Sequence, residues 1–312
     1  MDMRGEAWMS RMRTGDFEGA WQISDEVLAD RRGLRCNDRP RHEQWVWHGE
    51  PLRGNVLIRC YHGLGDTIQF IRYAPVVRRM AQRVSVEAQP ELLSLVRTVA
   101  GIDEVCPLGQ IVARSYHVAA EVMELPHILR TCIDTIPCET PYFEIQPERI
   151  AFDADLNVGL VWSAGDWDTR RSIPFEIIRE LGRIPGVRWH VLQRGPAAHV
   201  WNKSFGLDSS RDDLLELAQR IAGLALLISV DSMPAHLGGA LAVPTWLLLH
   251  SECDWRWMTD RSDSPWYPTM RLFRQQRSGE WSDVVHRVKR ELQKELESHR
   301  RSRRAKLDQD AT

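Results

Sequence analysis

From residue 55 onward, the hydrophobic and polar positions of the chain switch repeatedly between two periods. Short apolar runs, typical of buried strands, alternate with longer segments whose apolar residues recur at helical spacing. Strands separated by helices pair in parallel, so this order predicts an α/β fold with helices on the faces of a parallel sheet. The predicted strands are 55–60, 84–88, 118–122, 157–162, 187–192, 225–230 and 244–249, and the predicted helices are 67–82, 90–99, 174–181, 211–222 and 234–241.

A polar, proline-marked stretch interrupts this pattern. It reads IPCETPYFEIQPERI and covers residues 136–150, after which the alternation restarts. The chain is therefore expected to hold two Rossmann-like domains in tandem, 51–150 and 151–295. Ligands of such sheets bind at the carboxyl ends of the strands. Two domains of this kind would leave a cleft between them, where small-molecule sites are common.

The two ends of the chain have a different character. The first 30 residues predict a helical hairpin, and GDFEGAWQISDEVLAD within it resembles one unit of a tetratricopeptide repeat. No second copy follows, so an ordinary helical pair packed on the next domain is an equally good interpretation. Residues 1–50 are thus a helical N-terminal segment with a linker. Residues 296–312, which contain HRRSRRAK, are expected to form a basic, disordered tail.

Composition is that of an ordinary globular protein. Of 312 residues, 43% are apolar and 27% charged, and the formal net charge is −2, so no nucleic-acid partner is expected. The six cysteines form no CxxC pair, and neither a metal nor a cofactor is expected. The first residues lack the apolar region of a signal peptide, and no apolar run nears the roughly 20 residues that span a bilayer. We expect a cytoplasmic protein, with peripheral contact at the inner face of the membrane left open.

The first candidate site is the turn in VLIRCYHGLGDTIQF, which connects a predicted strand to a predicted helix. Gly63 and Gly65 would let the backbone take unusual dihedral angles and let a ligand approach the main chain. Asp66 stands at or near the start of the helix, where it could cap the helix or act on a bound substrate. Neither GxGxxG nor the lysine of a P-loop is present, so a nucleotide phosphate held here by lysine is not expected.

The second candidate site lies in LLISVDSMPAHLGGALAVPTWLLL, residues 226–249. Asp231 and Ser232 follow a buried strand, and Pro234 stands in the first turn of the next helix. Amides and the helix dipole at that end suit an anion such as pyrophosphate, to which His236 could also donate. In the alternative interpretation, Asp231 and Ser232 only cap the helix and His236 is a satisfied polar residue.

The third candidate site is the loop in LVWSAGDWDTRRSIPF, residues 160–175. Ser163 begins the loop, and Arg171 ends it. Arginine at the carboxyl end of a strand suits phosphate binding, although a single arginine could be only a surface charge.

Four aromatic residues cluster in CDWRWMTDRSDSPWYP. Their rings could stack on a sugar or a base, or they could pin the C-terminal segment to the sheet, and packing is the favoured interpretation. These residues are Trp255, Trp257, Trp266 and Tyr267.

Taken together, GLGDTIQF, VWSAG…RRSIP, ISVDSMPAHLGGA and DWRW…SPWYPTMRLFRQ resemble glycosyltransferase family nine, the lipopolysaccharide heptosyltransferase family. The likeness is greatest to the branch fused to tetratricopeptide repeats, and it runs from about Trp45 to Arg290. It implies a B-type glycosyltransferase fold of two Rossmann-like domains. It also implies an inverting transfer, usually without a metal, from a nucleoside-diphosphate sugar to a glycan, a lipid-linked or a protein acceptor, with heptose as one candidate sugar.

The resemblance also implies roles for individual residues. Asp66 falls where the family has its proposed general base, and Arg171 falls near its basic residue for the donor phosphate. The remaining donor-binding candidates are Gly63, Gly65, Ser163, Asp231, Ser232 and His236. Two departures bear on donor binding: Pro234 replaces a residue with an amide, and the loop before Arg171 is short. The chief rival hypothesis is a catalytically weak relative, a scaffold that keeps the fold and nucleotide binding.

Overall fold

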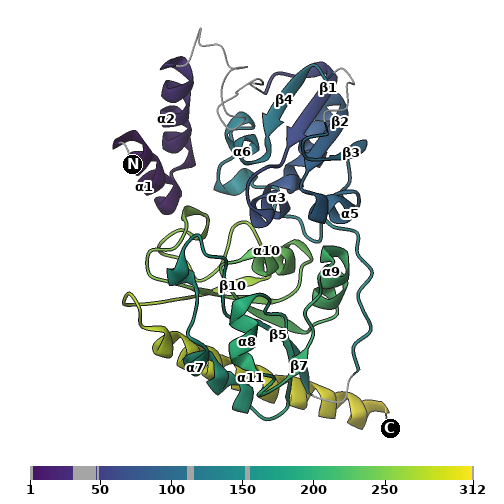
Figure 1. Ribbon diagram of the computed structural model, residues 1–312, viewed down its shortest axis with the longest axis vertical. Helices are drawn as coiled ribbons and strands as arrows, with labels where there is room; N and C mark the ends of the chain where they lie inside the picture. The colour runs from purple at the N-terminus through teal and green to yellow at the C-terminus, as the bar shows by residue number, and fades with distance from the viewer. Residues whose placement is uncertain (1–2, 31–46, 48, 111–115, 152–154, 311–312) are drawn as a thin grey trace. The chain divides into compact units, whose positions relative to one another are not determined.

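The computed structural model describes residues 3–30, 47, 49–110, 116–151 and 155–310, with side chains up to residue 302. Most of the predicted linker after residue 30 lies outside these ranges. The chain divides into two compact units (Figure 1). Unit 1 comprises Met1–Ile145, Asp213–Leu215 and Asp254–Pro268, and unit 2 comprises Gln146–Asp212, Glu216–Cys253 and Thr269–Thr312.

Unit 1 contains a four-stranded sheet in the order β3-β2-β1-β4, in which every pair of neighbours is parallel. The chain runs outward from β1 to β3 and then returns to place β4 on the other side of β1. The boundary between β1 and β4 is therefore a topological switch point, where open α/β sheets bind ligands. The strands are β1 (Leu52–Arg59), β2 (Ala81–Ala88), β3 (Glu104–Pro107) and β4 (Val118–Glu121).

The helix predicted over 67–82 is wrong as a single element. Helix α3 begins earlier, at Leu64, and a 3₁₀ turn, η3, separates it from α4, in which Pro75 occupies the first turn. Proline lacks the amide hydrogen that a continuous helix would need there, and Ala81 already belongs to β2. The helical elements are α3 (Leu64–Phe70), η3 (Ile71–Tyr73), α4 (Ala74–Met80), η4 (Pro90–Leu92), α5 (Leu93–Val96), η5 (Val122–Glu124), α6 (Leu125–Ile128) and η6 (Ile133–Thr135).

The predicted N-terminal hairpin is present as α1 (Met3–Thr14) and α2 (Phe17–Asp30), and Gly15 breaks it with a φ of 82°. The hairpin packs on the rest of unit 1. Met12 and Phe17 are buried, and the Trp21 indole N–H donates to the carbonyl of Thr131 at 2.7 Å. These contacts are those of a helical pair docked on its neighbouring domain.

The predicted domain 151–295 is not continuous in the structure, because the segment Asp254–Pro268 packs with unit 1. The Trp266 ring stacks on Phe17 with centroids 6.2 Å apart, and Trp255 lies edge-on to Trp8 at 5.5 Å. The favoured packing interpretation is therefore confirmed, since all four aromatic residues of the segment are buried in unit 1. Burial of these rings explains why the segment leaves the unit that surrounds it in sequence.

Unit 2 contains a six-stranded sheet in the order β10-β9-β8-β5-β6-β7, again parallel throughout. Strands β5, β8 and β9 are wholly buried, as near-continuous apolar runs require in a sheet covered on both faces. The switch point lies between β5 and β8. The strands are β5 (Leu156–Val161), β6 (Val187–Val191), β7 (Leu207–Asp208), β8 (Leu226–Val230), β9 (Thr245–Leu249) and β10 (Met270–Arg274).

Helix α10 lies close against this sheet because its residues are small. A Cβ at Gly238 would come within 2.7 Å of both Leu227 Cδ2 and Thr245 Oγ1, so a larger residue would push the helix away. Helix α10 spans Met233–Ala240. The other helical elements that lie wholly or mainly in unit 2 are η7 (Thr169–Arg171), α7 (Phe175–Ile178), η8 (Arg179–Arg183), α8 (Pro196–Trp201), α9 (Leu214–Ala222) and α11 (Trp281–Asp310). The 3₁₀ turn η9 (Trp255–Trp257) belongs to unit 1.

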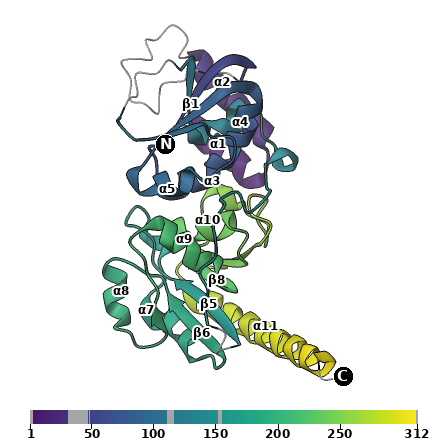
Figure 2. The same cartoon turned by 90° about the vertical axis from the view of Figure 1, so that its right-hand side faces the viewer.

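The prediction of a disordered tail over 296–312 is wrong for the described residues, because helix α11 continues through Asp310 (Figure 2). Its apolar stripe extends past the predicted boundary, with Leu292 and Leu296 both buried. Beyond them, Arg300 Nε donates to Asp155 Oδ2 at 2.7 Å. Lysine and arginine are good helix formers, so the basic composition does not end the helix. Despite its 30 residues, neither α11 nor any other described helix is apolar enough to cross a membrane.

Two truncations should separate the docked part of α11 from its end. Removing residues from His299 onward deletes the partly exposed ion pair of Arg300 with Asp155 and should lower the melting temperature by no more than about 3 °C. Removing residues from Glu291 onward also deletes Leu292 and Leu296 and should lower it by roughly 10 °C or more. Calorimetry on both proteins checks this, and equal melting temperatures would show that the buried leucines contribute nothing.

Candidate functional site

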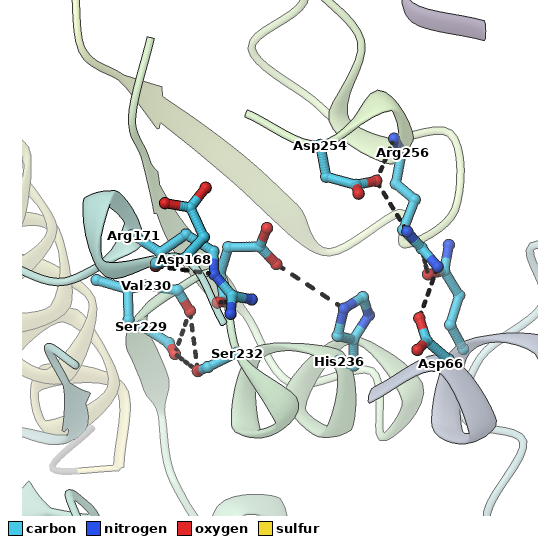
Figure 3. Close-up of polar contacts among 11 residues, drawn as sticks. Asp66, Asp168, Arg171, Ser229, Val230, Ser232, His236, Asp254 and Arg256 are labelled. Atoms are coloured by element: carbon cyan, nitrogen blue, oxygen red, sulfur yellow. Dashed lines mark hydrogen bonds and ion pairs between the residues drawn. The ribbon is translucent and has the colours of Figure 1, made fainter. Parts of the chain in front are cut away.

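At the switch point of unit 2, the loop after β5 meets the turn after β8 (Figure 3). Arg171 joins them, because its Nη1 donates to the carbonyl of Asp231 at 3.2 Å and its Nε donates to the carbonyl of Asp168 at 3.4 Å. The Arg171 guanidinium also lies over the Trp167 ring, 5.4 Å from the centroid. The structure therefore brings two of the predicted donor-binding residues, Arg171 and Asp231, into direct contact.

The loop after β5 is closed at its base. The amide of Ile173 donates to the carbonyl of Trp162 at 2.8 Å, and the hydroxyls of Ser163 and Ser172 lie 3.1 Å apart. Gln193, two residues after β6, accepts from the amides of Trp162 and Ser163 at 3.0 and 2.8 Å. Ser163 thus helps to hold the loop in shape. Sequence reasoning did not single out Gln193, although it follows a predicted strand.

The charged side chains of this loop contact one another and neighbouring residues. Asp168 accepts from the amide of Arg170 at 3.0 Å and forms an ion pair with its side chain, which holds the pKa of the Asp168 carboxyl below its usual value. Arg170 also pairs with Glu252 at 2.7 Å. His250 lies 3.7 Å from Asp168, and burial lowers the pKa of its imidazole. Arg170 thus pairs with carboxylates, whereas Arg171 binds main-chain carbonyls.

Helix α10 begins at this edge of the sheet without a side-chain cap from Ser232. The Ser232 hydroxyl instead donates to the carbonyl of Val230 at 3.1 Å, so the capping interpretation is wrong for this residue. His236 Nε2 lies 3.9 Å from Asp231 Oδ1, and both side chains are buried. A helix start next to an arginine is an arrangement that can hold an anion such as a diphosphate.

Asp66 in unit 1 occupies the third position of α3, and the N-cap is Gly63. The carboxylate reaches back, and its Oδ2 accepts from the amide of Gly63 at 3.0 Å. A Cβ on Gly63 would lie 3.0 Å from that oxygen, so glycine leaves room for this contact. The expected unusual dihedral angles are not found, since Gly63 has a φ of −65° and Gly65 lies within α3.

The second oxygen of Asp66 is held by a residue far away in sequence. Arg256 Nη2 donates to Asp66 Oδ1 at 2.6 Å (Figure 3). Arg256 is buried and also donates to Asp254 Oδ1 at 2.9 Å and to Gln69 Oε1 at 2.8 Å. Its guanidinium lies over the Phe70 ring as well. Sequence reasoning missed this arginine. The pattern that could have indicated it is a charged residue between two tryptophans in DWRW.

Glu121 stands at the end of β4, beside the switch point of unit 1. Its side chain is 4% exposed, and within the described part of the chain its Oε1 has no hydrogen-bond partner. His62 Nε2 lies 3.6 Å from that oxygen, and the amide of Met123 donates to Oε2 at 2.9 Å. Burial, followed by the nearby carboxylate of Glu124, raises the pKa of Glu121 to about 9. Glu121 therefore holds a proton at neutral pH.

The predicted site residues divide between the two units. Gly63, Gly65 and Asp66 belong to unit 1, and Ser163, Arg171, Asp231, Ser232 and His236 belong to unit 2. Across the described ranges, no three histidine, cysteine, aspartate or glutamate side chains gather as a metal site.

Comparison with known proteins gives one sequence relative and several structural neighbours. No protein-family model matches the chain. Protein FlbA of Caulobacter vibrioides is 24% identical over an alignment of 313 positions, gaps included, which covers 84% of this chain and 51% of FlbA. The chain thus spans about half the length of the relative that it matches.

Solved glycosyltransferases share the fold. A family 9 glycosyl transferase from Veillonella parvula has a TM-score of 0.54 and 14% identity, over 73% of this chain and 88% of that one. The E. coli ADP-heptose lipopolysaccharide heptosyltransferase II has a TM-score of 0.52 and 14% identity, over 79% and 99%. The dodecameric, iron-containing heptosyltransferase TibC from enterotoxigenic E. coli, solved with ADP-D-beta-D-heptose, has a TM-score of 0.53 and 15% identity, over 75% and 67%.

These likenesses establish the fold. The chain has the two-sheet, parallel α/β fold of family 9 glycosyltransferases and carries helices at its N-terminus, so the fold expected from its sequence is confirmed. Identities near 14% go no further than the fold. Membership in the branch fused to tetratricopeptide repeats stays a prediction.

Arg256 should be a large contributor to the stability of unit 1. Arg256→Ala removes a buried cation from two carboxylates and should lower the free energy of unfolding by about 3 kcal/mol. Arg261→Ala is the matched control, because Arg261 lies in the same segment but pairs with the exposed Asp263, and it should cost less than about 1 kcal/mol. Urea unfolding measures both, and equal losses would contradict a special role for Arg256.

The contribution of Glu121 to the stability of the chain should fall as the pH rises. The folded chain binds this proton more tightly than the unfolded chain does. The stability that Glu121 contributes is therefore greatest below about pH 4.5 and declines toward about pH 9, by up to about 1.4 kcal/mol per pH unit. Glu121→Gln keeps a neutral side chain and should flatten this decline in urea titrations between pH 5 and 9. Identical pH profiles for the two proteins would show that Glu121 is not protonated in the fold.

Proposed function

We propose that the chain is an inverting glycosyltransferase that moves a sugar from a nucleoside-diphosphate donor to a hydroxyl of a glycan, lipid-linked or protein acceptor. The observation that carries the proposal is the contact of Arg171 with the carbonyl of Asp231, next to the start of α10, in a glycosyltransferase fold. A diphosphate is the leaving group of such a transfer, and a site built for it is the first requirement of the reaction.

On the donor side, unit 2 binds the diphosphate. The guanidinium of Arg171 offers planar, fixed donors that suit phosphate oxygens, and the start of α10 adds the positive end of the helix dipole. As the sugar departs, negative charge grows on the diphosphate, and these groups stabilise that charge. His236, one turn into α10, and Ser232 complete the proposed donor set.

On the acceptor side, Asp66 is the proposed general base. It takes the proton of the acceptor hydroxyl while that oxygen forms a bond to the anomeric carbon. The bond between that carbon and the phosphate oxygen breaks, and the configuration at the carbon inverts. Arg256 and the amide of Gly63 hold the carboxylate in one orientation. No metal or cofactor is included in this mechanism.

The donor is the least specified part of the proposal. Structural neighbours include a heptosyltransferase solved with ADP-D-beta-D-heptose, so ADP and ADP-heptose are the first probes to use. Heptose is proposed as the transferred sugar on this ground, with hexoses as the other class.

A scaffold that binds nucleotides without catalysis is the second candidate, and one observation favours it. Both oxygens of Asp66 already accept hydrogen bonds, one of them from the cation of Arg256. With both oxygens engaged, the carboxylate must exchange one of these contacts before it can accept a proton from a substrate hydroxyl. If both contacts persist with substrate bound, Asp66 acts only as a structural ion-pair partner.

A comparison of two variants distinguishes these candidates. Asp66→Asn keeps the shape of the side chain, should bind donor normally and should lower kcat by at least ~100-fold, the scale of general-base catalysis. Asp254→Asn is the matched control, because it alters the other carboxylate that Arg256 contacts and should keep most of the activity.

The assay begins with a thermal-shift screen of the wild-type chain against nucleoside-diphosphate sugars, followed by measurement of transfer from those that bind. Full activity of Asp66→Asn would overturn the proposed mechanism. A wild-type chain that binds a donor and transfers no sugar from it to any class of acceptor would favour the scaffold.

A further inference from the structure

Trp167 is an exception among the tryptophans of this chain. Its side chain is 84% exposed, whereas every other described tryptophan is buried or half-buried. Exposing an indole to water forgoes the large stabilisation that burial would provide. Single exposed apolar residues occur on most proteins, so the position of Trp167 decides whether it has a role.

The position is the loop after β5, at the switch point of unit 2. This loop is tied at its base by the contacts of Ile173 with Trp162 and of Ser163 with Ser172. Within the loop, Asp168 caps η7 by accepting from the amide of Arg170. The loop therefore presents Trp167 on a braced turn, at the sheet edge where ligands of this fold class bind.

Arg171 connects the indole to the anion-binding elements. Its guanidinium packs over the Trp167 ring, and its Nη1 donates to the carbonyl of Asp231, at the turn that leads into α10. An aromatic face, an arginine and a helix start thus lie along one edge of the sheet. A ligand matched to all three combines a flat ring with a diphosphate.

We propose that Trp167 forms the stacking surface for the nucleobase of a nucleoside diphosphate whose phosphates bind Arg171 and the start of α10. The inference rests on the proposed function, since it takes the donor to be a nucleoside-diphosphate sugar. Trp167 is then a substrate-binding residue of unit 2. The indole has two faces, one packed by Arg171 and the other available to the base.

Stacking sets the kind of selectivity that this surface provides. Every base has a flat face, so an aromatic platform binds all of them and discriminates weakly between bases. Removing such a platform weakens binding by roughly 5- to 150-fold per base. Larger purine rings overlap an indole more fully, so the loss should be greater for ADP and GDP than for UDP and CDP.

The test is calorimetric titration of the full chain with ADP, GDP, UDP, CDP and inorganic pyrophosphate. Trp167→Ala should weaken binding of ADP by at least about 5-fold and leave the affinity for pyrophosphate unchanged, because pyrophosphate has no base to stack. Trp167→Phe keeps an aromatic face and should recover most of the affinity for ADP. Val200→Ala is the matched control, since Val200 is also exposed, at 60%, and lies on α8 of the same unit.

The outcomes separate this inference from the proposed function. If the wild-type chain binds a nucleoside diphosphate and Trp167→Ala binds it equally well, the stacking role is overturned and the proposed function stands. If Trp167→Ala loses pyrophosphate and ADP to the same extent, the indole acts only by orienting Arg171, and base stacking is again overturned. If the wild-type chain binds none of the four nucleotides, the nucleoside-diphosphate donor of the proposed function is overturned, and the stacking role of Trp167 is overturned with it.

Discussion

The candidate site of unit 1 depends on one buried cation, Arg256. A buried guanidinium is stable only when its charge and its donors are satisfied, and Arg256 meets this condition with Asp66, Asp254 and Gln69. Its position is determined by the segment Asp254–Pro268, which the aromatic rings of unit 1 hold in place. Arg72 adds a second buried contact by donating to the carbonyl of Trp266 and stacking on the Tyr267 ring, 4.5 Å from its centroid.

This construction has a direct consequence for chemistry. The carboxylate of Asp66 is held in one orientation by Arg256 and by the amide of Gly63, which is favourable for a positioned base. The same cation forms an ion pair with the carboxylate at 2.6 Å. Glu121, buried nearby on β4, has the opposite character, because burial keeps its proton in place at neutral pH. Unit 1 thus holds one ion-paired and one protonated carboxyl group beside the same switch point.

Both units use the same topology to assemble their residues. In each sheet the chain winds outward in one direction and then returns to the other side of its first strand, β1 in unit 1 and β5 in unit 2. The loops that leave the two strands at the switch point diverge there and leave room for polar side chains. In unit 1 these loops supply Asp66, and in unit 2 they supply Arg171 and Asp231. Three of the four motifs that resemble glycosyltransferase family nine include these loops.

The sequence by itself determined the alternation of strands and helices, the two-sheet fold and the stretches that carry polar residues, because apolar periodicity is a local property of the chain. It also indicated Asp66, Arg171 and Asp231, which stand at strand ends. Only the tertiary structure decided that Arg256 contacts Asp66 from 190 positions away, that Asp254–Pro268 belongs to unit 1, and that the basic end continues helix α11. The physical reason is that burial of aromatic rings and pairing of buried charges join residues distant in sequence, which no local pattern records.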